Sequence, residues 1–212
     1  MMTRSILRAN PPDHGRMRSL VGQVFTPRRV AGLRPAIDEA VAALLDRLAE
    51  AGADGTAGVD FMDLFAFQLP VTVICELLGI PDQERHPFRA LAADLTGALE
   101  PAADITDTAE AAARELAGYF TALIAQRRAV PSDDLIGALV AARDTEATGV
   151  SETELLANLI MLLVAGFETT TNLLGNGLAL LLNRPELADD LRSGEIGVAA
   201  FIEEVLRHDS PV

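Results

Sequence analysis

Apolar residues recur along most of this chain at the spacing of one helical face, and strand-like alternation is nearly absent. Val59-Asp60-Phe61 is the one short candidate for a strand. The pattern predicts helices over residues 13–25, 31–51, 62–79, 82–98, 105–128, 132–143, 151–182, 185–192 and 197–208. Because no repeat or low-complexity linker separates these segments, we predict a single, mainly α unit over residues 1–212.

The longest predicted helix begins at Ser151. Ser151 and Glu154 have the spacing of a capping box, and Val150 and Leu155 have that of a hydrophobic staple. The apolar pattern continues to Leu182, which gives a helix of roughly 48 Å at the usual rise per residue. A helix so long and so apolar must run through the middle of its protein.

The centre of this helix, Ala165-Gly166-Phe167-Glu168-Thr169-Thr170, departs from the pattern. Gly is unfavourable in a helix interior by about 1 kcal/mol, and a buried carboxylate is costly unless it is paired or hydrated. We therefore expect a local opening where Gly166 lets another group approach the backbone. Thr169 either bonds the Ala165 carbonyl or releases it and bends the helix. Glu168 and Thr169 are able to pass protons into a dry cavity; the alternative is a kinked helix whose Glu168 binds an Arg at an edge.

Two further pairs stand at helical spacing. His14 and Arg18 are four residues apart, so they share a helix face beside an apolar stripe, where they either hold a buried anion or lie exposed. Glu204 and Arg207 are three apart, which favours a surface ion pair in the last helix.

The chain carries a formal charge of −14, and all 17 of its cationic residues are Arg. This acidity argues against a nucleic-acid-binding protein. Seven Arg but only Asp13 among the acids fall in residues 1–35, so this segment is either a docking face for an acidic partner or a basic terminus without one. A single Cys and three scattered His exclude a disulfide framework within the chain and make a metal cluster improbable. Cys75 lies in an apolar helical run, where a core thiol is expected.

The segment Leu155–Leu182 is long enough to span a membrane. Asn158, Glu168, Asn172 and Asn176 interrupt it, and no cationic flank follows. The first residues contain no apolar run of signal-peptide length. We therefore expect a buried helix in a soluble, cytoplasmic protein.

Three motifs, taken in this order, resemble the cytochrome P-450 family of haem-thiolate monooxygenases, closest to its soluble bacterial members. The first is Pro11-Pro12-Asp13-His14-Gly15-Arg16-Met17-Arg18, followed by Phe25-Thr26-Pro27-Arg28-Arg29-Val30; the second is Ala165–Thr170; the third is Glu204-Val205-Leu206-Arg207, followed by Pro211. Their order and helical settings cover essentially the whole chain. The resemblance implies the helical portion of the P-450 fold, running from the haem-propionate helix to the E-x-x-R helix.

The resemblance also implies a cofactor, haem b. His14 and Arg18 match the positions that hold the haem propionates. Ala165 and Gly166 match the small pair that lies over the haem, where dioxygen binds.

Further roles follow from the same resemblance. Glu168 and Thr169 match the acid–alcohol pair that delivers protons for cleavage of the oxygen–oxygen bond. Phe167 is expected to face the pocket of a hydrophobic small-molecule substrate. Glu204 and Arg207 match a structural pair that supports the core.

Arg16, Arg28 and Arg29 fall where the family's basic face meets an acidic ferredoxin-type electron donor. The family's haem-ligand Cys follows the E-x-x-R helix, and Val212 comes just after that helix, so we expect residues 1–212 alone to lack the metal ligand and to be inactive. Two alternatives remain: a Cys-less helical partner that stabilises another enzyme, and a ligand-binding helical regulator, although no DNA-reading helix-turn-helix is visible.

Overall fold

The computed structural model describes residues 4–55, 58–85, 87–96, 106–145 and 149–211, and no strand occurs among them. Its α-helices are α1 Asp13–Val24, α2 Pro27–Gly32, α3 Arg34–Ala51, α4 Gln68–Leu78, α5 Phe88–Thr96, α6 Asp107–Ala129, α7 Leu135–Thr145, α8 Glu152–Asn183, α9 Pro185–Ser193 and α10 Val198–His208. Short 3₁₀ turns, η2 Ile6–Arg8 and η4 Asp82–Glu84, and a π-helical turn, η3 Met62–Ala66, lie between them. The prediction of a mainly α fold is confirmed.

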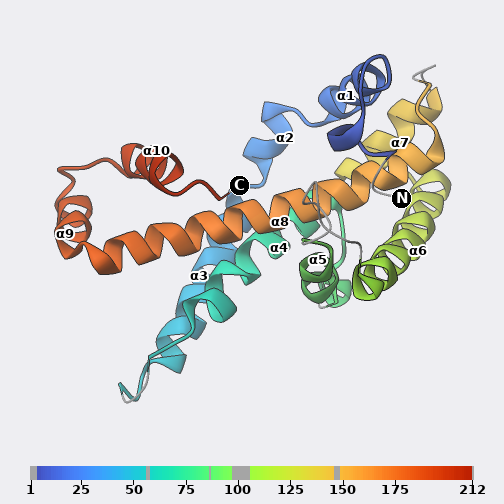
Figure 1. Ribbon diagram of the computed structural model, residues 1–212. Coiled ribbons are helices and arrows are strands. Elements are labelled where there is room, and N and C mark those ends of the chain that lie inside the picture. Colours follow the sequence, from blue (N-terminus) through green and yellow to red (C-terminus); the bar gives the residue numbers. More distant parts are fainter. Residues whose placement is uncertain (1–3, 56–57, 86, 97–105, 146–148, 212) are drawn as a thin grey trace.

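The long helix α8 is the axis of the molecule (Figure 1). Helices α4, α5 and α6 pack against it, α7 packs on α6 and α1, and α3 packs on α4. Helices α9 and α10 lie at the end of α8 that is remote from α6 and α7. One apolar cluster joins α1, α4, α5, α6, α7 and the first half of α8.

The start of α8 is built as the sequence predicts. The Ser151 hydroxyl accepts a hydrogen bond from the Glu154 amide at 3.2 Å, and the Glu154 carboxylate accepts one from the Ser151 amide at 2.7 Å. Val150 and Leu155 are both buried in the apolar cluster. The capping box therefore fixes where the central helix begins.

The structure corrects several expectations between residues 26 and 88. Residues 27–32 form a separate helix, α2, whose N-cap Thr26 accepts from the Arg29 amide at 3.3 Å. The predicted strand at residues 59–61 is absent, because the segment runs directly into the π turn η3. The helix predicted over 62–79 is divided into η3 and α4, and the one predicted over 82–98 into η4 and α5. Helix α4 ends as predicted, with Gly79 in the left-handed region at φ 77°.

The local opening expected at residues 165–170 is wrong. Helix α8 is continuous from Glu152 to Asn183. The Thr169 hydroxyl donates to the Ala165 carbonyl at 2.9 Å, which adds to the helical hydrogen bonding at this point. Of the two conformations open to Thr169, the structure shows the bonded one.

Helix α8 is long and apolar enough to cross a membrane, but half of its most apolar stretch is buried inside the molecule. Its neighbours there are α4, α5 and α6. Packing of this kind is the behaviour of a core helix.

Candidate functional site

One narrow stripe of α8 carries polar side chains near both of its ends. Residues separated by 4, 7 or 11 positions lie within about 40° of one another around a helix. The stripe consists of Glu154, Asn158, Met161, Ala165, Thr169, Asn172 and Asn176, and Met161 is its one large apolar side chain and is buried. Its two ends are polar, and its middle consists of a methyl group and a hydroxyl.

The first end of the stripe is covered by the α1 region. The Asn158 side-chain oxygen accepts from the Ile6 amide at 2.9 Å, and its Nδ2 donates to the Glu154 carbonyl at 2.7 Å and lies 3.2 Å from the sulfur of Met17. Glu154 also accepts from Arg16 of α1 at 3.1 Å. Asn158 is 3% exposed, so these contacts form inside the protein.

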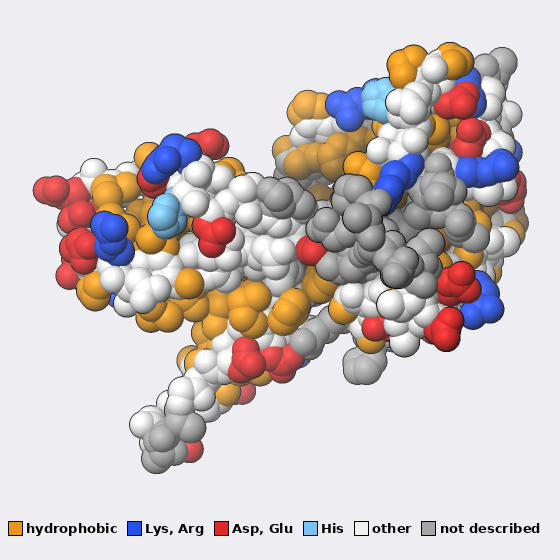
Figure 2. All heavy atoms as spheres, in the orientation of Figure 1, with side chains coloured by type: hydrophobic (Ala, Val, Ile, Leu, Met, Phe, Trp, Pro, Cys, Tyr) orange, Lys and Arg blue, Asp and Glu red, His pale blue; other side chains and the backbone are white. Residues whose placement is uncertain are grey.

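The second end is covered by the segment after α10. Asn172 Nδ2 donates to the Pro211 carbonyl at 3.4 Å, and Asn176 Nδ2 donates to the Asp209 carbonyl at 3.1 Å. Figure 2 shows a notch in the molecular surface between α10 and the α1–α2 region, above the middle of α8. The covered ends of the stripe therefore stand on either side of its small central residues.

The middle of the stripe is formed by Ala165 and Thr169, which are both half-buried. The Thr169 hydroxyl uses its proton in the hydrogen bond to the Ala165 carbonyl. Its oxygen can therefore still accept a hydrogen bond from a group outside the helix. This part of α8 presents a flat, nearly apolar surface with one polar atom.

Gly166 lies about 100° from Ala165 around the helix, and its neighbour is another helix. A Cβ at position 166 would lie 2.9 Å from Cδ1 and 3.0 Å from Cγ1 of Ile74 in α4. The close approach to the α8 backbone that the sequence predicts is therefore made, at this residue, by Ile74.

Glu168 and Phe167 line a small hollow beside the stripe. The hollow has a volume of about 150 Å³ and is completed by Phe67, Ala93, Thr171 and Asn172. Glu168 is half-buried there. Phe167 is 2% exposed and its ring centroid lies 6.0 Å from that of Phe67, so it belongs to the core as well as to the wall of the hollow.

His14 and Arg18 lie on one edge of α1. His14 is half-buried and Arg18 is exposed. Arg16 and Arg18 stand about 100° to either side of Met17 around the helix. Arg16 binds Glu154 and Met17 contacts Asn158, so these two residues join α1 to the start of α8, while His14 and Arg18 lie on the other side of Met17.

The three arginines predicted to form a docking face have different surroundings. Arg16 pairs with Asp13 at 2.7 Å and also binds the Gly149 carbonyl. Arg29 donates to the Asp133 carbonyl at 2.8 Å. Arg28 is exposed and forms no ion pair within the described part of the chain.

Glu204 and Arg207 form a pair within α10 itself. Arg207 Nε lies 2.8 Å from Glu204 Oε2, and the second contact is 2.5 Å. Hydrogen bonding from the Arg207 guanidinium lowers the pKa of the Glu204 carboxyl. Both side chains are more than half exposed, as the spacing alone suggests.

Cys75 is fully buried in α4, as predicted. Burial raises the pKa of its thiol to about 12. It is therefore a protonated core residue at neutral pH. It lies on α4 and so is not part of the α8 stripe.

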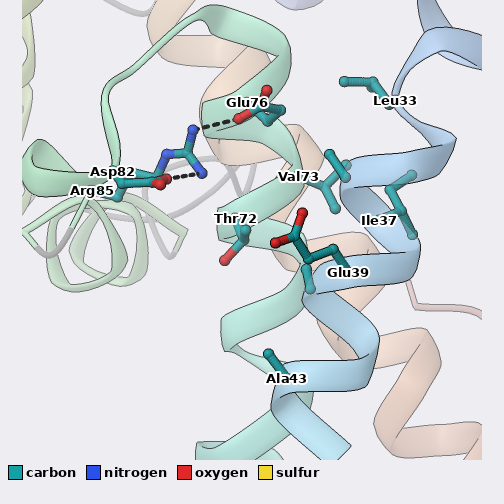
Figure 3. Close-up of a pocket in the computed structure, with 11 residues that line it drawn as sticks. Leu33, Ile37, Glu39, Ala43, Thr72, Val73, Glu76, Asp82 and Arg85 are labelled. Atoms are coloured by element: carbon teal, nitrogen blue, oxygen red, sulfur yellow. Dashed lines mark hydrogen bonds and ion pairs between the residues drawn. The ribbon is translucent and has the colours of Figure 1, made fainter.

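A second hollow, of about 260 Å³, lies between α3 and α4, with an apolar floor that includes Ile37 and Val73 (Figure 3). Arg85 crosses its rim and pairs with Glu76 at 2.6 Å and with Asp82 at 2.5 Å. None of the residues predicted to be functional lines it.

Sequence reasoning missed the role of the three asparagines. In the sequence, Asn158, Asn172 and Asn176 stand out only as interruptions of an apolar segment. Their separations of 14 and 4 residues, with Ala165 seven after the first, place them on one line. That spacing was the signal that they mark the edges of a site.

Comparison with known proteins agrees with this architecture. The sequence profile of the family described as Cytochrome P450 matches residues 101–197. Cytochrome P450 107B1 of Saccharopolyspora erythraea is 44% identical over 207 residues, which are 98% of this chain and 48% of that protein. Cytochrome P450 monooxygenase PikC of Streptomyces venezuelae is 39% identical over all of this chain and 49% of its own length.

Solved structures agree as well. The structure of CalO2 superimposes with a TM-score of 0.86 at 30% identity and covers 99% of this chain and 51% of that one. P450BioI, solved in complex with an acyl carrier protein that bears hexadec-9Z-enoic acid, gives a TM-score of 0.84 at 32% identity, over 97% of this chain and 52% of its own.

The helical architecture and the α8 stripe define a helical portion of a haem-protein fold. Over the region that it spans, the chain matches bacterial cytochrome P450s, and the comparisons support a portion of a protein of that family. It spans about half the length of the curated relatives that it matches.

Proposed function

We propose that the protein that contains these residues is a haem-dependent monooxygenase, which inserts one oxygen atom of dioxygen into a hydrophobic small molecule. The observation that carries the proposal is the α8 stripe. Its small central residues, Ala165 and Thr169, lie between two polar ends that are held by contacts to the α1 region and to the segment after α10, and Figure 2 shows a notch between those two parts of the molecule.

The residues present fit a haem at this notch. A flat macrocycle needs a surface without bulky side chains, and Ala165 supplies it. Its carboxylates need cationic donors at one edge, and His14 and Arg18 share one edge of α1, the helix that is joined to α8 through Met17 and Asn158. When bound, a haem supplies the oxygen chemistry that no side chain can supply.

The role of this chain is to orient and to deliver protons. The Thr169 hydroxyl donates its proton to the Ala165 carbonyl and so can accept a hydrogen bond from a donor group in the notch and orient it. Glu168, the preceding residue, lines a hollow of about 150 Å³ and is proposed to supply protons from solvent to that donor group. Phe167 is proposed to form the apolar wall on the substrate side.

The thiolate ligand of the haem has to come from outside residues 1–212, since the single Cys of this chain is buried in α4. Residues 1–212 alone are therefore expected to have no monooxygenase activity. We propose a cytoplasmic protein with a ferredoxin-type electron donor, for which the exposed Arg28 is the best placed of the three predicted arginines.

The test measures product formed per dioxygen consumed, in the protein as its gene encodes it, with a hydrophobic substrate and an electron donor. Thr169→Ala is expected to lower this ratio by about tenfold or more, the scale of a lost proton-transfer group. Thr170→Ala is the matched control, because Thr170 is exposed on the neighbouring face. Equal ratios in the two variants contradict the role of Thr169. If the protein instead stabilises a partner enzyme without catalysis, it binds no haem, and neither the unaltered protein nor either variant forms product.

A further inference from the structure

The hydrogen bonds of Asn158 and the Arg16–Glu154 ion pair join α1 to the start of α8, which suggests that they position α1 in addition to stabilising the fold. Asn158 contacts three separate segments: the Ile6 amide, the sulfur of Met17 in α1, and its own helix at the Glu154 carbonyl. Every polar atom of this buried side chain is satisfied. A residue of this kind fixes one arrangement of its neighbours, because any displacement leaves a buried polar group without a partner.

Glu154 performs two tasks with one carboxylate. One oxygen accepts from the Ser151 amide and hydroxyl at 2.7 and 2.9 Å and so caps α8. The other accepts from Arg16 of α1 at 3.1 Å. Burial raises the pKa of Glu154, but the hydrogen bonds from Ser151 and Arg16 together lower it by more, so the net shift of the pKa is downward. The point where α8 begins is thereby joined to the point where α1 docks.

Helix α1 packs mainly on α7 and on the η2 turn. Its buried contact residues Met17 and Leu20 are apolar, and apolar attraction has little directional preference. The polar contacts at Asn158 and Glu154 are directional and therefore restrict where α1, which carries His14 and Arg18, lies on α8.

We propose that Asn158, together with the Arg16–Glu154 pair, is a positioning residue that fixes α1 on α8 and so positions the proposed propionate donors His14 and Arg18 that α1 carries. This inference rests on the proposed haem function. It assigns to Arg16 a role inside the protein in place of partner docking.

The first measurement needs no haem. Hydrogen exchange of the Ile6 amide and of the α1 amides is followed in Asn158→Ala and Arg16→Gln. We expect exchange about tenfold faster in both, with the buried middle of α8 unchanged. The matched control is Asn183→Ala, because Asn183 also lies on α8 but donates only within its own helix, to the Ala179 carbonyl at 2.9 Å. Unchanged α1 exchange in Asn158→Ala overturns the inference.

The second measurement is haem affinity by absorbance titration of the protein as its gene encodes it. Asn158→Ala is expected to weaken binding several-fold in the native background and to have no effect when His14 and Arg18 are already replaced by Gln, because it acts through them. An equal loss in both backgrounds, or faster α1 exchange with unchanged haem affinity, overturns the inference and leaves the proposed function intact. Failure of the unaltered protein to bind haem overturns the proposed function itself, and with it the haem part of the inference, while the exchange result still decides whether Asn158 fixes α1.

Discussion

The two halves of α8 differ sharply in how they are packed. From Leu155 to Val164 nearly every side chain is buried, against α4, α5 and α6. From Leu173 to Leu182 most are only half-buried, and Leu182 is 72% exposed. Helix α9, which follows, has no buried residue, and α10 has only Val205. One continuous helix thus passes from a complete core into an open surface.

The difference indicates that the residues of α8 that stabilise the fold are largely distinct from those that form the candidate site. The first half of α8 fixes the fold, while the polar stripe crosses both halves and depends on a few directional contacts at each end. The apolar side chains left exposed around the second half include Leu182, Val198 and Ile202, at 72%, 65% and 41%. Identical substitutions in the two halves should therefore have different effects.

The largest expected difference is between Leu159→Ala and Leu182→Ala. Leu159 is fully buried, so its truncation should lower the free energy of unfolding by about 2–5 kcal/mol. Leu182 is exposed, and its truncation should change that free energy by less than about 0.5 kcal/mol. Denaturant unfolding of residues 1–212 measures both. Similar losses in the two variants would show that the second half of α8 is packed as tightly as the first.

A smaller effect is expected at the glycine where α4 meets α8. Gly166→Ala places a methyl group against Ile74, and overpacking of this kind costs about 1–3 kcal/mol, partly offset by a gain of about 1 kcal/mol in helix propensity. The control is Gly118→Ala in α6, where no atom lies within 4 Å and a gain of about 0.5–1 kcal/mol is expected. A stabilising Gly166→Ala in thermal unfolding would contradict the close packing of Ile74.

A pH effect is expected from the ion cluster that joins the ends of α6, α7 and the start of α8. Arg128 lies 2.7 Å from Asp144 and 2.8 Å from Glu152, and its hydrogen bonds lower the pKa of both carboxyls below their ordinary values of 3.8 and 4.5. Their contribution to stability is therefore complete above those values and is lost as the pH falls below them. We expect Arg128→Gln to flatten the acid side of the stability profile. Asp189→Asn, in the exposed pair of α9, is the control, and an equal flattening there would contradict this account.

The smallest effect is expected at the α10 pair. Glu204→Gln removes an ion pair whose two side chains are both exposed, so the melting temperature of residues 1–212 should not change measurably. A clear decrease, measured by circular dichroism, would show that the pair supports the fold within this chain.

The helices themselves were predictable where the local signals were strong. The capping box at Ser151, the Gly79 C-terminus and the apolar spacing placed α8 and the end of α4 within one residue. The division at residues 27–34 was not predicted, because the Thr26 cap and Pro27 were not recognised as the start of a new helix. The break expected at 165–170 was wrong because helix propensity alone omits the packing of Ile74 against Gly166.

The sequence indicates which residues are candidates for the site, but it indicates only part of the contacts that these residues make. The sequence indicated Ala165, Thr169, His14 and Arg18, whose haem roles stay predictions. It could not indicate that Arg16 also binds Glu154, since an ion pair between residues more than a hundred positions apart depends on the tertiary fold.

The central claim is that the middle of the α8 stripe faces a haem held by donors on α1. Absorbance titration of haem into the protein as its gene encodes it tests this most directly, with the unaltered protein compared with a variant that carries His14→Gln and Arg18→Gln. We predict saturable binding at one equivalent in the unaltered protein and at least roughly tenfold weaker binding in the variant, the scale expected for lost charge-assisted hydrogen bonds. Equal affinity in the two proteins, or no saturable binding at all, would contradict the account.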